Sequence, residues 1–445
     1  MLIRFIAKNI YSFKEETEFN LFPNKTHGLQ HHKVKHGDFE FLRFSAIYGA
    51  NGSGKSNLIK SISFLETLVT EGKLPMETKD LKFKLNDENL KSPISLGIEF
   101  IASSKTYFYT ITFDADKILY EYLAKSQKET DVLVFERIFD TDIQKIQFYK
   151  DYYKSDKDRL FVEVLSEKLI QKNELLITFL SEKYPEDFKS VRAAFDWFDE
   201  TLYIIEPDAK PLGIANTLDK KNKIKDFANK FISSLNTGIS EIEVEKKEFE
   251  EFVDNKDTKL KKSIIENLKN SPGSFSILMN KETGEEVTLA YENDEIIVKR
   301  LITKHLNSFG KSIDFHLEQE SDGTKRLIDY IPAFQGIINE NKVFIIDEIE
   351  RSIHPMTIKE IISKLALDEN MKGQLIFSTH ESNLLDQSIL RPDEIWFAQK
   401  DLDGSSKLYS LSDFKIHNTI NIENGYLKGR FGGIPFLGNL KDLNW

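Results

Sequence analysis

The sequence contains no cysteine, and this absence removes several classes of chemistry. Without cysteine, the chain of 445 residues has no disulfide, no thiolate metal site and no cysteine nucleophile. It also lacks any run of eighteen uninterrupted apolar residues, so we expect no membrane-spanning segment. The N-terminus, Met1 to Ile6, is apolar only briefly and lacks the basic flank and long apolar run of a signal peptide. These features together predict a cytoplasmic protein.

An excess of positive charge is also missing. The formal net charge is −11, which does not favour a general nucleic-acid coat protein. The one clearly basic cluster, Lys256, Lys259, Lys261 and Lys262, is the place where nucleic acid would bind if the protein has such a site. Hydrophobic residues make up 40% and charged residues 30%, as in ordinary globular proteins, and the length predicts two structural units.

The hydrophobic pattern divides the chain into three parts. Residues 1–150 begin with strand-like alternation to residue 22, continue through an apolar run at 41–48 and a helical pattern at 57–70, and turn β-rich after residue 81. Residues 151–272 have helical periodicity and dense charge, which predicts an inserted helical lobe. Residues 273–445 begin with an expected hairpin, in which a Lys281–Gly284 turn leads into a strand from Val287 to Ile297, and then return to alternating strands and helices. We therefore expect an α/β head built from both ends of the chain.

A phosphate-binding loop lies between the strand at 41–48 and the helix that follows. The segment Gly49-Ala50-Asn51-Gly52-Ser53-Gly54-Lys55-Ser56 matches the full pattern. Its glycines allow backbone N–H groups to turn towards a triphosphate, and the next helix adds its positive N-terminal end. Lys55 is expected to reach the β- and γ-phosphates and Ser56 to ligate Mg²⁺. The predicted nucleotide contacts are Gly49, Asn51, Gly52, Ser53, Gly54, Lys55, Ser56 and Asn57.

Two acids follow a second apolar strand. Val343 to Ile346 are apolar and lead directly into Asp347 and Glu348. In open α/β sheets ligands bind at the carboxyl ends of strands, which places both acids at the expected site. Asp347 is predicted to hold Mg²⁺ through water, and Glu348 to orient or deprotonate the attacking water. A third strand, ending at Thr379, leads into His380, which can contact the γ-phosphate.

A further motif precedes the acidic strand. In Glu320-Ser321-Asp322-Gly323-Thr324-Lys325-Arg326, the residues Ser321, Gly323 and Thr324 stand at the start of a helix that we expect to begin near Thr324. Such a helix N-terminus binds phosphate. The loop at 49–56 already holds the phosphates of its own head, so the economical interpretation is a contact to the γ-phosphate of a second head. The alternative is a simple helix cap, since serine and aspartate are good capping residues.

The order of these motifs resembles the ABC-type ATPase heads shared by SMC, RecN and RecF proteins. Ser321–Thr324 resembles their signature motif, although the leucine and the final glutamine of transporters are absent. Glu350 to Pro355 resembles the D-loop that follows Walker B, whereas a Q-loop glutamine is not evident between residues 57 and 320.

The chain is also similar to bacterial AAA ATPases of anti-phage defence, including OLD-family heads and the ATPase subunits of Septu and PARIS systems. This similarity also covers Phe135–Arg137, the run from Ser378 to Leu385 and the tail from Gly425 to Gly432. It implies ATP and Mg²⁺ as cofactors, a homodimer or higher homo-oligomer formed through the heads, and a separate effector such as a nuclease or toxin.

Three functional hypotheses follow. The first is a sensor or regulator whose heads close on ATP and open on hydrolysis. The second is a DNA-repair ATPase like RecF or RecN, and the third is a scaffold that binds ATP without turnover. Intact Lys55, Asp347 and Glu348 favour hydrolysis over the scaffold. Asp401-Leu402-Asp403-Gly404 superficially offers the paired acids of a nuclease, but a hairpin turn explains this segment more simply.

Overall fold

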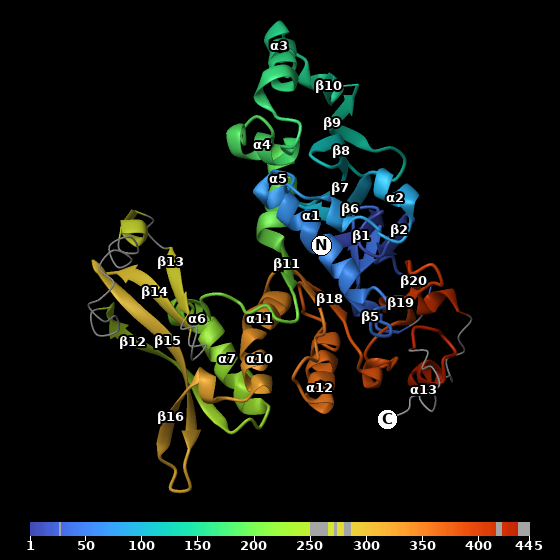
Figure 1. The fold of residues 1–445 in the computed structure, drawn as a ribbon. Coiled ribbons are helices and arrows are strands. Elements are labelled where there is room, and N and C mark those ends of the chain that lie inside the picture. Colours follow the sequence, from blue (N-terminus) through green and yellow to red (C-terminus); the bar gives the residue numbers. More distant parts are fainter. Residues whose placement is uncertain are drawn as a thin grey trace. The chain divides into compact units, whose positions relative to one another are not determined.

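A computed structural model describes residues 1–25, 28–141, 143–249, 266–270, 274–279, 286–414 and 421–434. The chain forms two compact units, and each is described by itself. Unit 1 contains residues 1–207, 339–349 and 359–445, and unit 2 contains residues 208–338 and 350–358 (Figure 1). The unit boundaries thus differ from those expected at residues 150 and 272. The basic cluster at Lys256–Lys262 and the Lys281–Gly284 turn lie outside the described residues.

A six-stranded sheet in unit 1 carries the phosphate-binding loop. Its strand order is β11-β17-β18-β5-β19-β20, and every neighbouring pair is parallel except β19 with β20. The central strands are buried along their whole length and mostly apolar, as expected for a parallel sheet covered on both faces. The strands are β5 Phe44–Tyr48, β11 Leu202–Ile205, β17 Val343–Ile346, β18 Gln374–Ser378, β19 Ile395–Lys400 and β20 Ser406–Ser410.

A seven-stranded antiparallel sheet forms the other layer of unit 1. Its order is β10-β9-β8-β7-β6-β1-β2, so strands from both sides of the loop segment pair in one sheet. Alternating buried positions along β7 match the alternating apolar residues of that strand. The strands are β1 Leu2–Lys8, β2 Thr17–Asn20, β6 Ile94–Ala102, β7 Lys105–Asp114, β8 Lys117–Lys125, β9 Val132–Asp140 and β10 Ile143–Phe148; a separate hairpin pairs β3 Lys33–His36 with β4 Phe39–Leu42.

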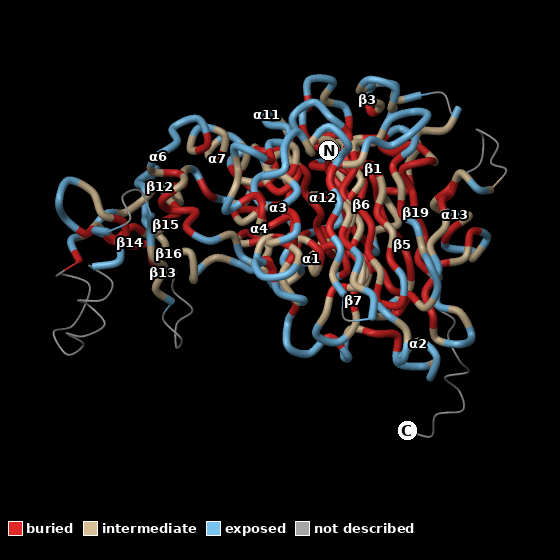
Figure 2. Tube along the Cα trace, turned by 90° about the horizontal axis from the view of Figure 1, so that it is seen from above, coloured by how far each residue is buried: buried red, intermediate tan, exposed pale blue. Residues whose placement is uncertain are grey.

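Helix α1, Lys55–Glu71, joins the two sheets of unit 1 into one core. Its buried residues recur at helical spacing, from Leu58 to Val69, and belong to the same hydrophobic cluster as side chains of both sheets. Figure 2 shows buried strands enclosed by exposed connections. The other helices that lie wholly or largely in unit 1 are α2 Asp87–Lys91, α3 Asp156–Val164, α4 Leu176–Lys183, α5 Lys189–Asp196, α12 Pro355–Ala366 and α13 Ile422–Leu427.

Unit 2 combines a third sheet with several helices. In that sheet β12 Ile239–Glu248, β15 Glu295–Leu306, β14 Glu286–Glu292 and β13 Phe275–Met279 are neighbours in this order, and β16 Ser312–His316 pairs with β15. The helices are α6 Ile214–Lys220, α7 Asn222–Ser234, α10 Asp322–Asp329 and α11 Ile331–Asn339. Phe231 of α7 packs edge-on against Phe334 of α11 at 5.6 Å between ring centroids.

Two local predictions need correction. Residues 151–272 are not wholly helical, because β11 and β12 lie within them. The dense charges of β12 conceal its strand character in the sequence, since only one face of this strand is covered. The expected strand from Val287 to Ile297 is instead two strands, because Asn293 and Asp294 both adopt positive φ (49° and 68°) and form a hairpin turn. The expected hairpin at Asp401–Gly404 is confirmed by the pairing of β19 with β20.

Candidate functional site

The loop after β5 has the backbone that its glycines predict. Gly52 and Gly54 have φ of 74° and 114°, a region that other residues rarely adopt, and Gly54 precedes the first residue of α1. A Cβ atom at Gly49 would lie 2.5 Å from the carbonyl oxygen of Ala398, so this position has no room for a side chain. The loop is closed by a hydrogen bond from Ser53 N–H to the Ala50 carbonyl at 3.1 Å. Asn51 and Gly52 are exposed at its tip.

Lys55 and His380 meet beside this loop. The Lys55 ammonium is buried; it donates to the Gly49 carbonyl at 2.8 Å and lies 3.2 Å from His380 Nε2. His380 follows β18, which pairs in parallel with β5, so the ends of both strands reach the same edge of the sheet. The sequence placed these two residues in one site from motif order alone, and the structure brings them into contact. Both side chains therefore lie beside the loop at 49–56, at the edge of the sheet where β5 and β18 end.

Asp347 and Glu348 stand at the same edge, at the end of β17. Asp347 is buried, and its carboxylate accepts a hydrogen bond from the Ser378 hydroxyl. The same hydroxyl accepts from the Glu348 backbone N–H at 2.8 Å. Glu348 has φ of 50°, an unusual value for a residue with a side chain, and this hydrogen bond helps to hold it. Ser378 therefore positions both acids, although the sequence offered no signal for it beyond a small polar residue at a strand end.

Serine hydroxyls from other segments form hydrogen bonds with the loop and the start of α1. The Ser406 hydroxyl, on β20, donates to the Ser53 carbonyl at 2.7 Å and lies 2.8 Å from the Ser12 hydroxyl. Asn57 also donates to Ser12, at 2.8 Å. The side-chain amide of Asn57, an expected nucleotide contact, is thus hydrogen-bonded to this serine. Ser12 and Ser406 are far from the loop in sequence, and no pattern in the sequence singled them out.

The donor set of the loop fits a magnesium-bound triphosphate. Lys55 supplies a buried cation, and Ser56 is partly exposed at the first turn of α1. The Ser53 hydroxyl is buried without a hydrogen-bond partner among the described residues, so it has bonding capacity for a ligand. Ser56 and Asp347 are the residues that would hold Mg²⁺. Among the described residues, no group of three or more His, Asp or Glu side chains could hold a metal by itself.

A cavity of about 480 Å³ opens on the outer side of the loop. It is lined by Gly49, Ala50, Asn51 and His380 and by the C-terminal residues Tyr426, Leu427 and Ile434. Burial raises the pKa of Tyr426, so its hydroxyl stays protonated and donates to the Gly433 carbonyl at 3.2 Å. The ring of Tyr426 stacks on Phe397 with centroids 5.6 Å apart. The tail segment at 421–434 is thereby fixed against the nucleotide loop, a placement that the sequence did not predict.

The motif at Ser321–Thr324 lies in unit 2, so it is described apart from the loop at 49–56. Helix α10 begins at Asp322, two residues earlier than expected, because the Ser321 hydroxyl accepts from Thr324 N–H at 3.1 Å and caps the helix. A Cβ atom at Gly323 would lie 2.5 Å from the Ser352 carbonyl, so the helix start lies against the segment that resembles a D-loop. Arg351 in that segment pairs with Asp208 at 2.5 Å.

No helix of the described chain combines the length and apolarity needed to cross a membrane. A family model described as "AAA domain, putative AbiEii toxin, Type IV TA system" matches residues 44–386. This range runs from β5 to the segment after His380 and includes the residues of the candidate site except Ser12, Phe397, Ala398, Ser406 and the tail.

Solved structures of SMC heads are among those similar to this chain. The SMC head domain from Thermotoga maritima is 14% identical, covers 93% of this chain and 99% of its own, and has a TM-score of 0.40. An SMC head bound to the C-winged helix domain of ScpA is 14% identical at TM-score 0.39, covering 92% of this chain and 97% of its own. An SMC head with an extended coiled coil, bound to a ScpA domain and derived from Pyrococcus furiosus, is 15% identical at TM-score 0.38, covering 92% and 96%. No curated protein matches the chain.

Proposed function

The chain belongs to the AAA-domain family whose model spans residues 44–386, and from this membership we propose that it hydrolyses Mg–ATP at the Gly49–Ser56 loop. The observation that carries the proposal is the convergence of Lys55, His380 and the Asp347–Glu348 pair at one edge of the parallel sheet. At this edge the phosphate-binding loop lies with two acids, of which Asp347 is buried and Glu348 is half-buried. Such an arrangement suits phosphoryl transfer to water, which depends on positioning and charge rather than on covalent chemistry.

Each residue has a distinct role in this proposal. Lys55 and the loop N–H groups of Gly49, Asn51, Gly52, Ser53 and Gly54 bind the phosphates, and Ser56 and Asp347 hold the metal. Mg²⁺ neutralises the charge that develops on the transferred phosphoryl group when it is bound. Glu348, half-buried and held by Ser378, orients the attacking water. His380, beside Lys55, contacts the γ-phosphate and reports its presence.

We further propose that two heads pair across ATP. Ser321, Gly323 and Thr324 would bind the γ-phosphate held by the loop of a second head. Ser321 is exposed and caps α10, which supports phosphate binding at the start of this helix. The position of Gly323 against the Ser352 carbonyl supports a role in holding the D-loop-like segment in place. The smallest assembly in this proposal is a homodimer.

The biological setting we propose is regulation of a separate effector in anti-phage defence. The description of the family names a type IV toxin–antitoxin system, and the motif order resembles defence ATPases. ATP-dependent pairing would then hold or release a nuclease or toxin. A DNA-repair role like that of RecF or RecN is the alternative, and turnover stimulated by DNA, with no copurifying effector, would favour it.

The first test is the mass of the purified protein in solution with and without ATP. We expect Glu348→Gln to bind ATP without hydrolysing it and to show an ATP-dependent rise in mass. Lys55→Ala should bind nucleotide poorly and keep its mass. Phosphate release should be lost in both variants. Equal mass of both variants under all conditions would refute head pairing, and full phosphate release by Glu348→Gln would refute the assignment of the acid.

Mixed assemblies test whether the sites are shared between heads. A mixture of Ser321→Ala and Lys55→Ala chains should regain at most one of two sites. In a mixed dimer the intact loop of the Ser321→Ala chain meets the intact motif of the Lys55→Ala chain, whereas the other site has both residues replaced. Ser240→Ala is the matched control, since Ser240 is an exposed serine of the same unit, on β12. Full activity of Ser321→Ala by itself would show that each head works alone.

A further inference from the structure

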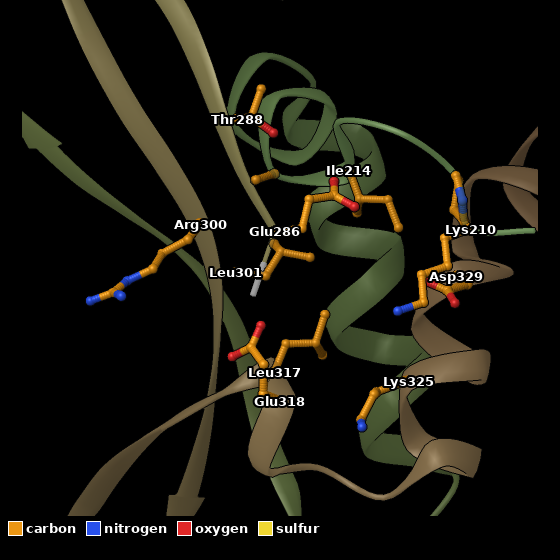
Figure 3. A pocket seen from close by; sticks show the side chains of 12 residues that line it. Lys210, Ile214, Glu286, Thr288, Arg300, Leu301, Leu317, Glu318, Lys325 and Asp329 are labelled. Carbon is orange, nitrogen blue, oxygen red and sulfur yellow. The ribbon is translucent and has the colours of Figure 1, made fainter. Parts of the chain in front are cut away.

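A cavity in unit 2 is separate from the nucleotide loop and has no role in the proposed hydrolysis. Its volume is about 170 Å³. At about 30 Å³ for each small group, this is room for about five or six non-hydrogen atoms. Figure 3 shows its walls, which come from α6, β14, β15, the turn at Leu317–Gln319 and α10. All of them belong to the same unit.

The cavity wall combines apolar, acidic and basic side chains. Pro211, Ile214, Ala215, Leu301 and Leu317 provide aliphatic surface. Glu286, Glu318 and Asp329 provide carboxyl groups from three different elements, β14, the turn at 317–319 and α10. An occupant with an aliphatic stem and a polar head would match this arrangement.

The carboxyl groups have unused acceptor capacity. Within the described part of the chain, Asp329 and Glu318 form no hydrogen bond or ion pair, and Glu286 accepts a single long bond from Gly213 N–H at 3.4 Å. Burial raises the pKa of Glu286. Burial also raises the pKa of Asp329, to about 6. Attraction by Arg326, Lys210 and Lys325 lowers this pKa, and repulsion from Glu286 raises it. Desolvated acids without donors are costly unless a cation joins them.

The basic residues that the structure describes around the cavity do not form ion pairs with these three carboxyl groups. Arg300 points away from the cavity in Figure 3 and pairs with Glu245. Lys325 donates to Asp322 at 3.2 Å. Lys210 is exposed and attracts Asp329 and Glu286 electrostatically, without a hydrogen bond or ion pair to either among the described residues. Lys210 and Lys325 attract Asp329, but among the described residues no basic side chain of the wall forms a hydrogen bond or ion pair with any of the three carboxyl groups.

We propose that this cavity binds a cationic group on an aliphatic stem, an ammonium or a guanidinium, held by Glu286, Glu318 and Asp329. The stem would cover Ile214 and Leu301, and the N–H groups would supply the donors that the three carboxylates lack. The cation comes either from a free amine or from a lysine or arginine side chain of another polypeptide. Occupancy would hold α10, the helix capped by Ser321, against β14 and the turn at 317–319.

The test is calorimetric titration of the full chain without nucleotide, at about pH 7.5, with agmatine, Nα-acetyl-arginine amide and glutarate as probes. We expect saturable binding of at least one cationic probe. Asp329→Asn should weaken it by roughly tenfold or more, because a charged partner is lost. Asp226→Asn, an exposed acid on α7 outside the cavity, should leave binding unchanged.

The probes distinguish the two sources of the cation. Binding of the blocked arginine as well as agmatine indicates a site for a polypeptide side chain, and binding of agmatine alone indicates a free amine. For either probe, affinity should fall below about pH 6 as Asp329 takes up a proton. No saturable binding of either cation, equal affinity in Asp329→Asn, or stronger binding of glutarate would overturn the proposal. Because ATP is absent from the titration, none of these results depends on hydrolysis or head pairing.

Discussion

Replacing Ser378 by alanine tests how the two acids of the site are held. One hydroxyl serves both acids, since it donates to the buried Asp347 carboxylate and accepts from the Glu348 N–H at 2.8 Å. Ser378→Ala removes both hydrogen bonds and adds no bulk. The bond to a charged group contributes about 1.5–3 kcal/mol and the bond to the N–H about 1 kcal/mol, so we expect a loss of roughly 2–4 kcal/mol in the free energy of unfolding.

The effect on activity should exceed what the loss of stability explains. Without the hydroxyl, Asp347 can rotate out of the position in which it would hold Mg²⁺, and Glu348 is no longer held at its positive φ. Loss of such a supporting hydrogen bond typically lowers metal affinity or activity by about 10- to 100-fold. We therefore expect kcat for phosphate release to fall by this factor and the Mg²⁺ concentration at half-maximal rate to rise.

Ser45→Ala is the matched control. Ser45 is a fully buried serine on β5 of the same sheet, and it donates one bond to the Glu394 carbonyl at 3.1 Å. This variant should lose about 1 kcal/mol of stability and keep its Mg²⁺ dependence. The assays are urea unfolding and phosphate release over a range of Mg²⁺ concentrations, both on folded protein. An unchanged Mg²⁺ dependence and kcat in Ser378→Ala, relative to Ser45→Ala, would refute the positioning role.

Three further predictions concern other sites. Above about pH 6, Asp329→Asn should raise the free energy of unfolding by at most about 3 kcal/mol, because the folded pKa of about 6 exceeds the ordinary 3.8 and the charged carboxylate destabilises the folded state. Near pH 4 the variant should give no gain, and urea unfolding above pH 6 and near pH 4 checks this. Gly323→Ala should lower the unfolding free energy by about 1–3 kcal/mol, since the new Cβ would approach the Ser352 carbonyl to 2.5 Å; an unchanged denaturation midpoint would contradict it. Ser406→Ala should weaken ATP binding without abolishing it, because the Ser53 carbonyl loses its 2.7 Å hydrogen bond below the loop; equilibrium binding of a fluorescent ATP analogue measures the change.

The sequence was sufficient for the local elements of the site. Gly49–Ser56 predicted a strand, a tight loop and a helix, because glycine at special φ values and the following apolar periodicity are local properties. The same holds for β17 with its terminal acids, and for the hairpin at Asp401–Gly404. Helix α10 was predicted with an error of two residues at its start, which is a common uncertainty at helix ends.

The sequence was a poorer guide to elements whose polar and apolar pattern depends on which of their faces other elements cover. The strand β12 carries charges on most positions because one of its faces is uncovered, and it was therefore assigned to a helical lobe. The division into two units also differs from the expected boundaries, since β11, from the middle of the chain, pairs with β17 in the central sheet. A strand of four residues has too short a pattern to predict pairing with a strand so distant in the sequence.

The chemistry that we propose for the loop and the acids follows from the sequence by itself, because the identity and order of Lys55, Ser56, Asp347, Glu348 and His380 are properties of the chain. Only the tertiary structure decided which residues support them. Ser12, Ser378 and Ser406 reach the site through strand pairing and loop packing, and the carboxyl groups of the second cavity come from three separate elements. Hydrogen bonds between residues remote in sequence depend on distance in space, and that distance exists only after the sheets have formed.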